Sequence, residues 1–167
     1  MNGGFGMARW LGGTVVAVSL FGLSVPAHGQ AWSARQRAAV ADTIRIQADR
    51  LIGTIGNIDR FMELFTTEPD LVYVDNGRIY PNREALAKAA GGFFKRVRST
   101  GGKWEPAHVL PLSPSSGAFT GIFRPQMVDT SGAALWTEGK IWTFVYQRRG
   151  GKWVIVQAHE INAKPTP

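Results

Sequence analysis

Two periodicities divide the chain. In residues 33–65 and 82–97, most hydrophobic residues recur at spacings of three and four, which is typical of helices that bury one face. From Gly101 onward, hydrophobic and polar residues alternate, as in strands with one face buried. Helices followed by a long run of strands predict an α+β domain, with the helices on one face of a mostly antiparallel sheet.

Capping signals predict where three helices begin. Ser33 and Gln36 have the spacing of a capping box, and Gly53 and Gly56 end the helix that follows. Asn57 is a suitable cap for a short second helix, and a third helix begins near Asn82. The predicted buried stripe of the first helix is Val40, Ile44, Ala48, Leu51 and Ile55.

Glycines mark two further features. Asn76-Gly77 follows a short strand and predicts a tight hairpin turn, because both residues tolerate positive φ. Gly91-Gly92 lies inside the third helix, where each glycine costs about 1 kcal/mol relative to alanine. We therefore expect a close packing contact or a bend at that point.

The alternating region predicts a meander of four strands, with turns at residues 113–117, 129–132 and 149–151. If the alternation is uninterrupted, His108 points to the same face of its strand as Trp104, and His159 to the same face as Trp153. Both histidines can then face one enclosed space, while Glu160 faces the other side. Which parity points inward stays open, because both faces carry apolar residues.

The N-terminal segment has the features of a secretory signal peptide. Arg9 precedes an apolar run that ends at Pro26 and a small-residue pattern, which predicts cleavage after Gly29. Met7 is an alternative start. The apolar run is shorter than the ~20 residues that span a bilayer, so no stable membrane anchor is expected. We expect residues 30–167 to form one exported domain, periplasmic or secreted.

Charge and cysteine content narrow the function classes. The formal net charge is +7, but the basic residues are scattered and the chain is predicted to be exported, so a nucleic-acid partner is not expected. The absence of cysteine excludes disulfides and thiolate chemistry.

Three stretches resemble one known superfamily. They are DRFMELF at residues 59–65, NGR at residues 76–78 and the closing GKWVIVQAHE at residues 151–160. In this combination they resemble the nuclear transport factor 2-like superfamily, and within it the SnoaL-like and ketosteroid isomerase-like domains of unknown function. The resemblance implies a cone, in which three helices pack on a strongly curved sheet around a pocket, and it implies pairing of two copies through the sheet. Some members are enzymes and others only bind, so fold does not settle function.

The resemblance makes Asp75 a candidate base. In isomerase-like members the proton-abstracting carboxylate lies on the strand after the second helix, and Asp75 is the acidic residue at the comparable place. Burial in an apolar pocket would raise the pKa of such a carboxyl and make it a base near neutral pH. The alternative, which general turn frequencies favour, is that Asp75 opens the turn at Asn76-Gly77. Steroid isomerase activity is not expected, because the oxyanion-hole donors of that enzyme have no counterpart here.

Two histidines complete the candidate catalytic set. His108 and His159, with Asp75 and Tyr73, offer the acid and base that a dehydratase needs. The alternative is a half-buried histidine bonded to a backbone carbonyl or a carboxylate. No metal is assigned, because three converging ligands are not evident. No cofactor is assigned either, because no nucleotide-binding loop is present.

The aromatic residues indicate the ligand. A cone rich in aromatic side chains with a few polar groups suits a small apolar or aromatic molecule. We therefore predict a ligand-binding domain, with a lyase or isomerase as one alternative and a dimeric interaction module without a functional pocket as another. Whether the protein is an enzyme stays open. The candidate ligand-binding residues are Tyr73, Tyr80, Phe94, Trp104, Phe119 and Trp142.

Overall fold

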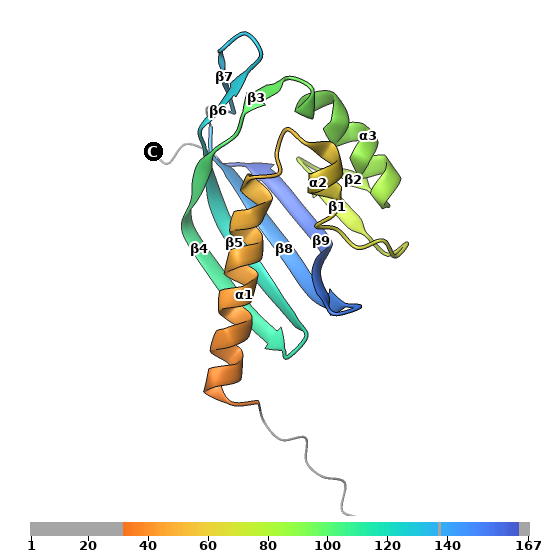
Figure 1. Cartoon of the computed structure of the whole chain (residues 1–167), viewed down its shortest axis with the longest axis vertical. Helices are drawn as coiled ribbons and strands as arrows, with labels where there is room; N and C mark the ends of the chain where they lie inside the picture. Colours follow the sequence, from red (N-terminus) through yellow and green to blue (C-terminus); the bar gives the residue numbers. More distant parts are fainter. Residues whose placement is uncertain (1–31, 137, 164–167) are drawn as a thin grey trace, which may run out of the picture. The chain divides into compact units, whose positions relative to one another are not determined.

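The computed structural model describes residues 32–136 and 138–163, so the predicted signal peptide lies outside the described residues. The α+β architecture is as expected, with three helices before the long strands (Figure 1). None of the described helices has the length and apolar character needed to cross a membrane. The helices are α1 (Ala34–Ile52), α2 (Ile58–Met62) and α3 (Arg83–Phe94).

Each helix begins at its predicted cap. Ser33 and Gln36 form the capping box: the Gln36 backbone N–H donates to Ser33 Oγ at 3.2 Å, and the Ser33 backbone N–H donates to Gln36 Oε1 at 2.6 Å. Asn57 and Asn82 accept from backbone N–H groups three residues later, at 3.0 and 2.9 Å. Local hydrogen bonding therefore fixes the helix starts, as their sequences predict.

The main sheet has six strands in the order β2-β1-β9-β8-β5-β4. All neighbours are antiparallel except β1 and β9, which pair in parallel. This pairing brings the first strand of the chain beside the last one. The strands are β1 (Val72–Asp75), β2 (Arg78–Tyr80), β4 (Gly102–Ser113), β5 (Ser116–Pro125), β8 (Lys140–Arg149) and β9 (Lys152–Asn162). A smaller sheet contains β3 (Val97–Ser99), β6 (Met127–Asp129) and β7 (Ala134–Leu135).

The core lies between α1 and the concave face of the main sheet. Figure 1 shows α1 running across β4 and β5, while α2 and α3 lie toward β1 and β2. Under α1, Trp104 packs against Phe119 at 4.9 Å between ring centroids, and its indole N–H donates to the Ala48 carbonyl at 3.2 Å. These two aromatic residues therefore belong to the core beneath α1.

Two β-bulges change which side chains face inward. On β4, Trp104 pairs with Phe123 of β5, but Ala107, three residues later, pairs with Gly121, only two residues away on β5. The extra β4 residue turns the later side chains of this strand to the other face of the sheet, and His108 is therefore exposed. On β9, Val156 is the extra residue opposite Val145 and Tyr146, so Glu160 is buried and His159 is exposed. The expectation that both histidines face one enclosed space is wrong, because a one-residue bulge moves every later side chain to the other face.

The glycine pair in α3 also differs from expectation. A Cβ added to Gly91 or Gly92 would meet no atom within 4 Å in the described part of the chain, apart from the helix itself and the chain neighbours. Of the two alternatives expected here, the close packing contact is therefore wrong, and the bend stays a prediction. The glycines leave free space along one side of α3.

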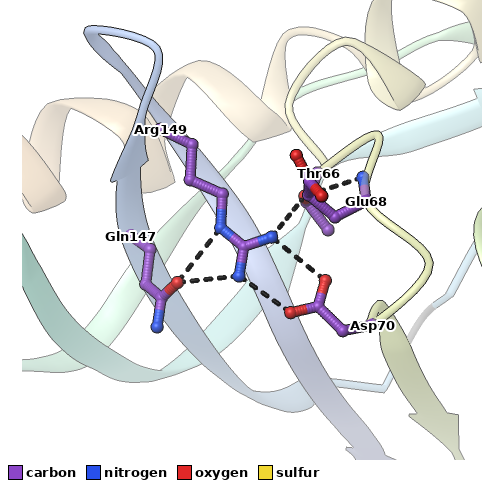
Figure 2. Close-up of polar contacts among 5 residues, drawn as sticks. All are labelled: Thr66, Glu68, Asp70, Gln147 and Arg149. Atoms are coloured by element: carbon purple, nitrogen blue, oxygen red, sulfur yellow. Dashed lines mark hydrogen bonds and ion pairs between the residues drawn. The ribbon is translucent and has the colours of Figure 1, made fainter.

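A single arginine joins the loop before β1 to the β8–β9 hairpin. Arg149 makes a bidentate pair with Asp70, with Nη1–Oδ1 and Nη2–Oδ2 distances of 3.0 and 2.8 Å (Figure 2). The same guanidinium donates to Thr66 Oγ1 at 3.0 Å and to Gln147 Oε1 at 2.8 Å from Nη2. Its fork of donors thus holds two segments that are far apart in the sequence.

Candidate functional site

A pocket of about 200 Å³ lies between α3 and the strands β1, β8 and β9. Its inner wall consists of buried side chains, including Phe61, Leu86, Phe94 and Trp142. Partly or fully exposed side chains form its outer part: Asp75, Tyr80, Ala89, Phe93 and Trp136. Most of the lining residues are therefore apolar or aromatic, and charged side chains complete the wall.

Three polar residues form a hydrogen-bonded group at the buried end of this pocket. Glu160 Oε1 accepts from Lys140 Nζ at 2.9 Å, and Glu160 Oε2 accepts from the Tyr73 hydroxyl. The three residues come from β9, β8 and β1, which are adjacent in the sheet. Lys140 and Glu160 are 6% and 5% exposed, so this is a buried ion pair with hydrogen bonds to both carboxylate oxygens.

Burial dominates the electrostatics of this group. It raises the pKa of Glu160 above the ordinary range, although the Lys140 charge and the Tyr73 hydrogen bond oppose the shift. Burial and the neighbouring Glu160 charge raise the pKa of Tyr73 well above its usual value. Tyr73 therefore stays protonated at neutral pH and donates its hydrogen bond to Glu160.

Aromatic rings surround the lysine. Lys140 Nζ lies 4.8 Å from the centre of the Trp136 ring, within the range of a cation–π interaction. Trp136 also stacks on Phe93 of α3, with ring centroids 4.4 Å apart and an angle of 4° between the planes. This stacked pair joins α3 to the segment before β8 at the outer part of the pocket.

Five of the residues predicted from the sequence meet in this pocket, and the others do not. Tyr73, Tyr80, Phe94 and Trp142 line it, as does Asp75. The predicted ligand-binding residues Trp104 and Phe119 instead pack in the core under α1. The exposed candidates His108 and His159 are not among the residues that line the pocket.

Asp75 lies both at the start of the Asn76-Gly77 turn and on the pocket wall, which the sequence left as alternatives. It lies at the end of β1 before the Asn76-Gly77 turn, and its Oδ1 accepts from Asn76 Nδ2 at 2.6 Å. It also lines the pocket, and it is directly opposite Glu160 in the parallel pairing of β1 with β9. The turn position and the pocket position are therefore compatible.

Sequence reasoning missed two polar residues of the site. Lys140 has the same parity as Trp142 on β8, and a lysine in such an apolar stretch is a signal that could have been found. Glu160 gave no comparable signal, because only the bulge at Val156 makes it face inward. Within residues 32–136 and 138–163, no three His, Asp or Glu side chains form a group that could hold a metal ion.

The chain belongs to the SnoaL-like domain family, whose model matches residues 51–160. Its architecture is that of the nuclear transport factor 2-like fold, with an open, curved, mostly antiparallel sheet. A comparison with curated proteins gave no match.

Several solved structures share this fold. A candidate calcium/calmodulin-dependent protein kinase II association domain from Xanthomonas campestris is 25% identical, with a TM-score of 0.60 over 81% of this chain and 91% of that chain. A candidate scytalone dehydratase from Novosphingobium aromaticivorans is 11% identical, with a TM-score of 0.66 over 79% of this chain and 89% of that chain. A candidate dehydratase from Streptomyces avermitilis is 12% identical, with a TM-score of 0.65 over 76% and 98%. At 11% and 12% identity, the two dehydratase-like structures support the fold alone.

Proposed function

We propose that this domain binds a small, mostly apolar molecule in the pocket beneath α3. The observation that supports the proposal is a space of about 200 Å³ between aromatic walls, with one buried polar group at its end. An apolar cavity of about 150 Å³ in another protein holds benzene, so this pocket has room for one substituted ring. The hydrophobic walls supply affinity, and the polar group supplies orientation.

Filling the pocket tests this proposal. Ala90 of α3 lines the pocket, and Ala90→Phe should occupy part of its volume. Ala38 lies on the exposed side of α1, so Ala38→Phe is the matched control. A panel of one-ring compounds is screened for binding by ligand-observed NMR. Binding by the wild type and the control, with at least about a tenfold loss in Ala90→Phe, supports the proposal. Equal binding by all three proteins, or no binding by any, contradicts it.

A lyase or isomerase is the second candidate function. It is favoured by the position of Asp75 and Glu160, which are directly opposite on adjacent strands and both line the pocket. Two carboxyl groups in different environments can divide the roles of acid and base. Asp75 is partly exposed, whereas Glu160 is buried with a raised pKa. In this version of the enzyme hypothesis, Glu160 takes the place of the histidines.

Proton exchange tests the second candidate without knowledge of the natural product. One-ring ketones are incubated with the protein in D₂O, and loss of the proton next to the carbonyl is followed by NMR. Exchange that Asp75→Asn abolishes, in a variant with wild-type thermal unfolding, supports acid/base chemistry. Exchange at the rate of buffer alone contradicts it.

We also propose that the domain is exported, on the basis of the signal-peptide features in residues 1–29. N-terminal sequencing of the protein from an exported fraction should give Gln30 as the first residue. Retention of the full chain in the cytoplasm would contradict export.

A further inference from the structure

The outer face of the main sheet, opposite α1, carries one row of side chains that crosses all six strands (Figure 1). Each residue of the row is the register partner of the next: Ile79 of β2, Val74 of β1, His159 of β9, Thr143 of β8, Thr120 of β5 and His108 of β4. These residues are partly or fully exposed, whereas their chain neighbours Tyr73, Phe119 and Phe144 are buried in the core. The row therefore lies on the face turned away from the core.

Apolar side chains flank this row on both sides. Ile161, Ile141 and Ile122 are register partners on one side of it. Leu110, Ala118 and Val145 are register partners on the other side. Of the six large hydrophobic side chains that are exposed in the described ranges, all except Ile46 of α1 lie on this outer face: Val72, Ile79, Leu110, Leu112 and Ile161. The exposed apolar surface of the domain is therefore concentrated here.

Charged side chains surround this apolar surface. They lie toward the ends of the strands: Lys103, Glu105 and Arg124 at one end, and Arg149 with Asp70 at the other. The row itself carries no Asp, Glu, Lys or Arg, although the formal net charge of the chain is +7. An apolar centre with a charged rim is the usual arrangement of a protein–protein interface.

The order of residues in the row favours a second copy of this chain as the partner. From β9 to β4 the row reads His159, Thr143, Thr120, His108, so it is the same in both directions. A two-fold axis that runs along the strands between β8 and β5 brings such a face against itself. It places Thr143 opposite Thr120 of the other copy, and His159 opposite His108 of the other copy. An uncharged centre also avoids the repulsion that two basic chains meet elsewhere.

We infer that two copies pair through the outer face while His108 and His159 are neutral, and that protonation of these histidines separates the copies. Histidine is the side chain that ordinarily changes its charge between pH 5 and 8. Between two apolar faces, each charged imidazole would lose water and meet a second positive charge. The dimer therefore binds fewer protons than two monomers, and pairing weakens as the pH falls.

The surroundings of the two histidines offer no ready compensation. His108 lies beside Thr120 of β5, with Leu110 two residues further along its own strand. His159 lies between Thr143 of β8 and Val74 of β1, with Gln157 and Ile161 on its own strand. The carboxylate of Glu105, on the same strand as His108, is already paired with Lys103 at 2.6 Å.

Sedimentation equilibrium of the purified protein at pH 7.5 and pH 5.5 tests the inference. The protein should be dimeric at pH 7.5. An ordinary histidine that must be neutral for pairing weakens the dimer about tenfold over this interval, and each copy contributes His108 and His159. The dissociation constant of the dimer should therefore rise at least about a hundredfold at pH 5.5.

Variants separate the histidines from other titrating groups. The double variant His108→Gln with His159→Gln keeps polar, uncharged side chains, so its dimer should be equally stable at both pH values. His159→Arg carries a permanent charge and should be mostly monomeric even at pH 7.5. Ala38→Arg adds the same charge on the exposed side of α1 and should leave the dimer intact.

Each contrary result overturns the inference. A wild type that is monomeric at pH 7.5 leaves the outer face to a different partner. A dimer of equal affinity at both pH values removes the histidine switch. Dissociation at pH 5.5 that persists in the double glutamine variant assigns the pH dependence to other groups. The proposed ligand pocket lies on the other side of the sheet, so its tests are independent of these outcomes.

Discussion

Glu160 carries the buried negative charge of the pocket, and its surroundings determine how it titrates. Burial raises its pKa above the ordinary value of 4.5, against the opposing effects of Lys140 and Tyr73. A carboxyl group with a higher pKa in the folded state holds its proton more tightly when the protein is folded. Its stabilising contribution is therefore fully present below the unfolded-state pKa, and it is lost as the pH rises through the folded-state pKa.

This titration predicts the pH dependence of one variant. The stability of the wild type relative to Glu160→Gln should decrease as the pH rises above the ordinary glutamate pKa of 4.5, because only the wild type then loses a proton that the folded state holds more tightly than the unfolded state. Urea unfolding at several pH values measures the difference. Glu63→Gln changes an exposed glutamate and is the control. Parallel stability curves for the wild type and Glu160→Gln would contradict the prediction.

At the scale of elements, α1 and β5 approach closely at Gly117. A Cβ at this position would lie 2.3 Å from Ile44 Cδ1 and 3.1 Å from the Leu110 carbonyl oxygen. Ile44 is fully buried and has little room to move. The absence of a side chain at Gly117 therefore allows α1 to pack directly on the sheet.

Gly117→Ala should lower the free energy of unfolding by about 1–3 kcal/mol, because it overpacks this contact. Ile44→Val removes Cδ1, so the double variant should be more stable than the sum of the two single effects implies. Gly91→Ala is the control, and it should stabilise α3 by up to about 1 kcal/mol, since open space surrounds Gly91. Urea unfolding measures the wild type and the four variants, and an additive double-mutant cycle would contradict the close contact.

The Arg149 contacts also predict how much two substitutions accelerate hydrogen exchange in the loop before β1. Arg149→Met should accelerate backbone hydrogen exchange in residues 66–70 more than Asp70→Asn does. The reason is that the arginine also bonds Thr66 and Gln147, whereas Asp70 is exposed (Figure 2). Hydrogen exchange followed by mass spectrometry measures the loop directly. Equal acceleration in the two variants would contradict a stabilising role of the Arg149 bonds to Thr66 and Gln147.

At the scale of the whole molecule, the face of the sheet opposite α1 carries exposed apolar side chains. Leu110 and Leu112 on β4 are 62% and 53% exposed, and Ile161 on β9 is 37% exposed. Leu110 and Leu112 lie close together on one strand, and neighbouring exposed apolar residues of this kind are a candidate interaction surface. We propose that a second copy of the chain covers this face, in line with the pairing that the family resemblance implies.

The proposal predicts a change of oligomeric state. The wild type should sediment as a dimer, and the double variant Leu110→Ser with Leu112→Ser should shift toward the monomer, because it removes apolar area from the interface. Ile46→Ser on α1 removes an equally exposed apolar residue and should leave the dimer intact. Sedimentation equilibrium measures the three proteins. A monomeric wild type at all concentrations would contradict the dimer.

Local signals were sufficient for much of the fold and for part of the pocket. Ser33, Asn57 and Asn82 cap their helices through atoms within three residues, so a short window of sequence contains the whole interaction. Tyr73 and Asp75 share a face because they are two residues apart on an uninterrupted strand. The aromatic residues of the pocket were predicted only in part, because composition does not separate the wall of a pocket from the core.

The sequence by itself determined the α+β class, the helix starts, the hairpin turn at Asn76-Gly77 and the family, because these depend on short-range periodicity, capping and turn chemistry. Only the tertiary structure decided which residue of the His159-Glu160 pair belongs to the pocket. The extra residue at Val156 and the parallel pairing of β9 with β1 turn Glu160 inward, toward Tyr73 and Lys140. The physical reason is that a bulge is defined by the register between strands, and the sequence of one strand does not contain that register.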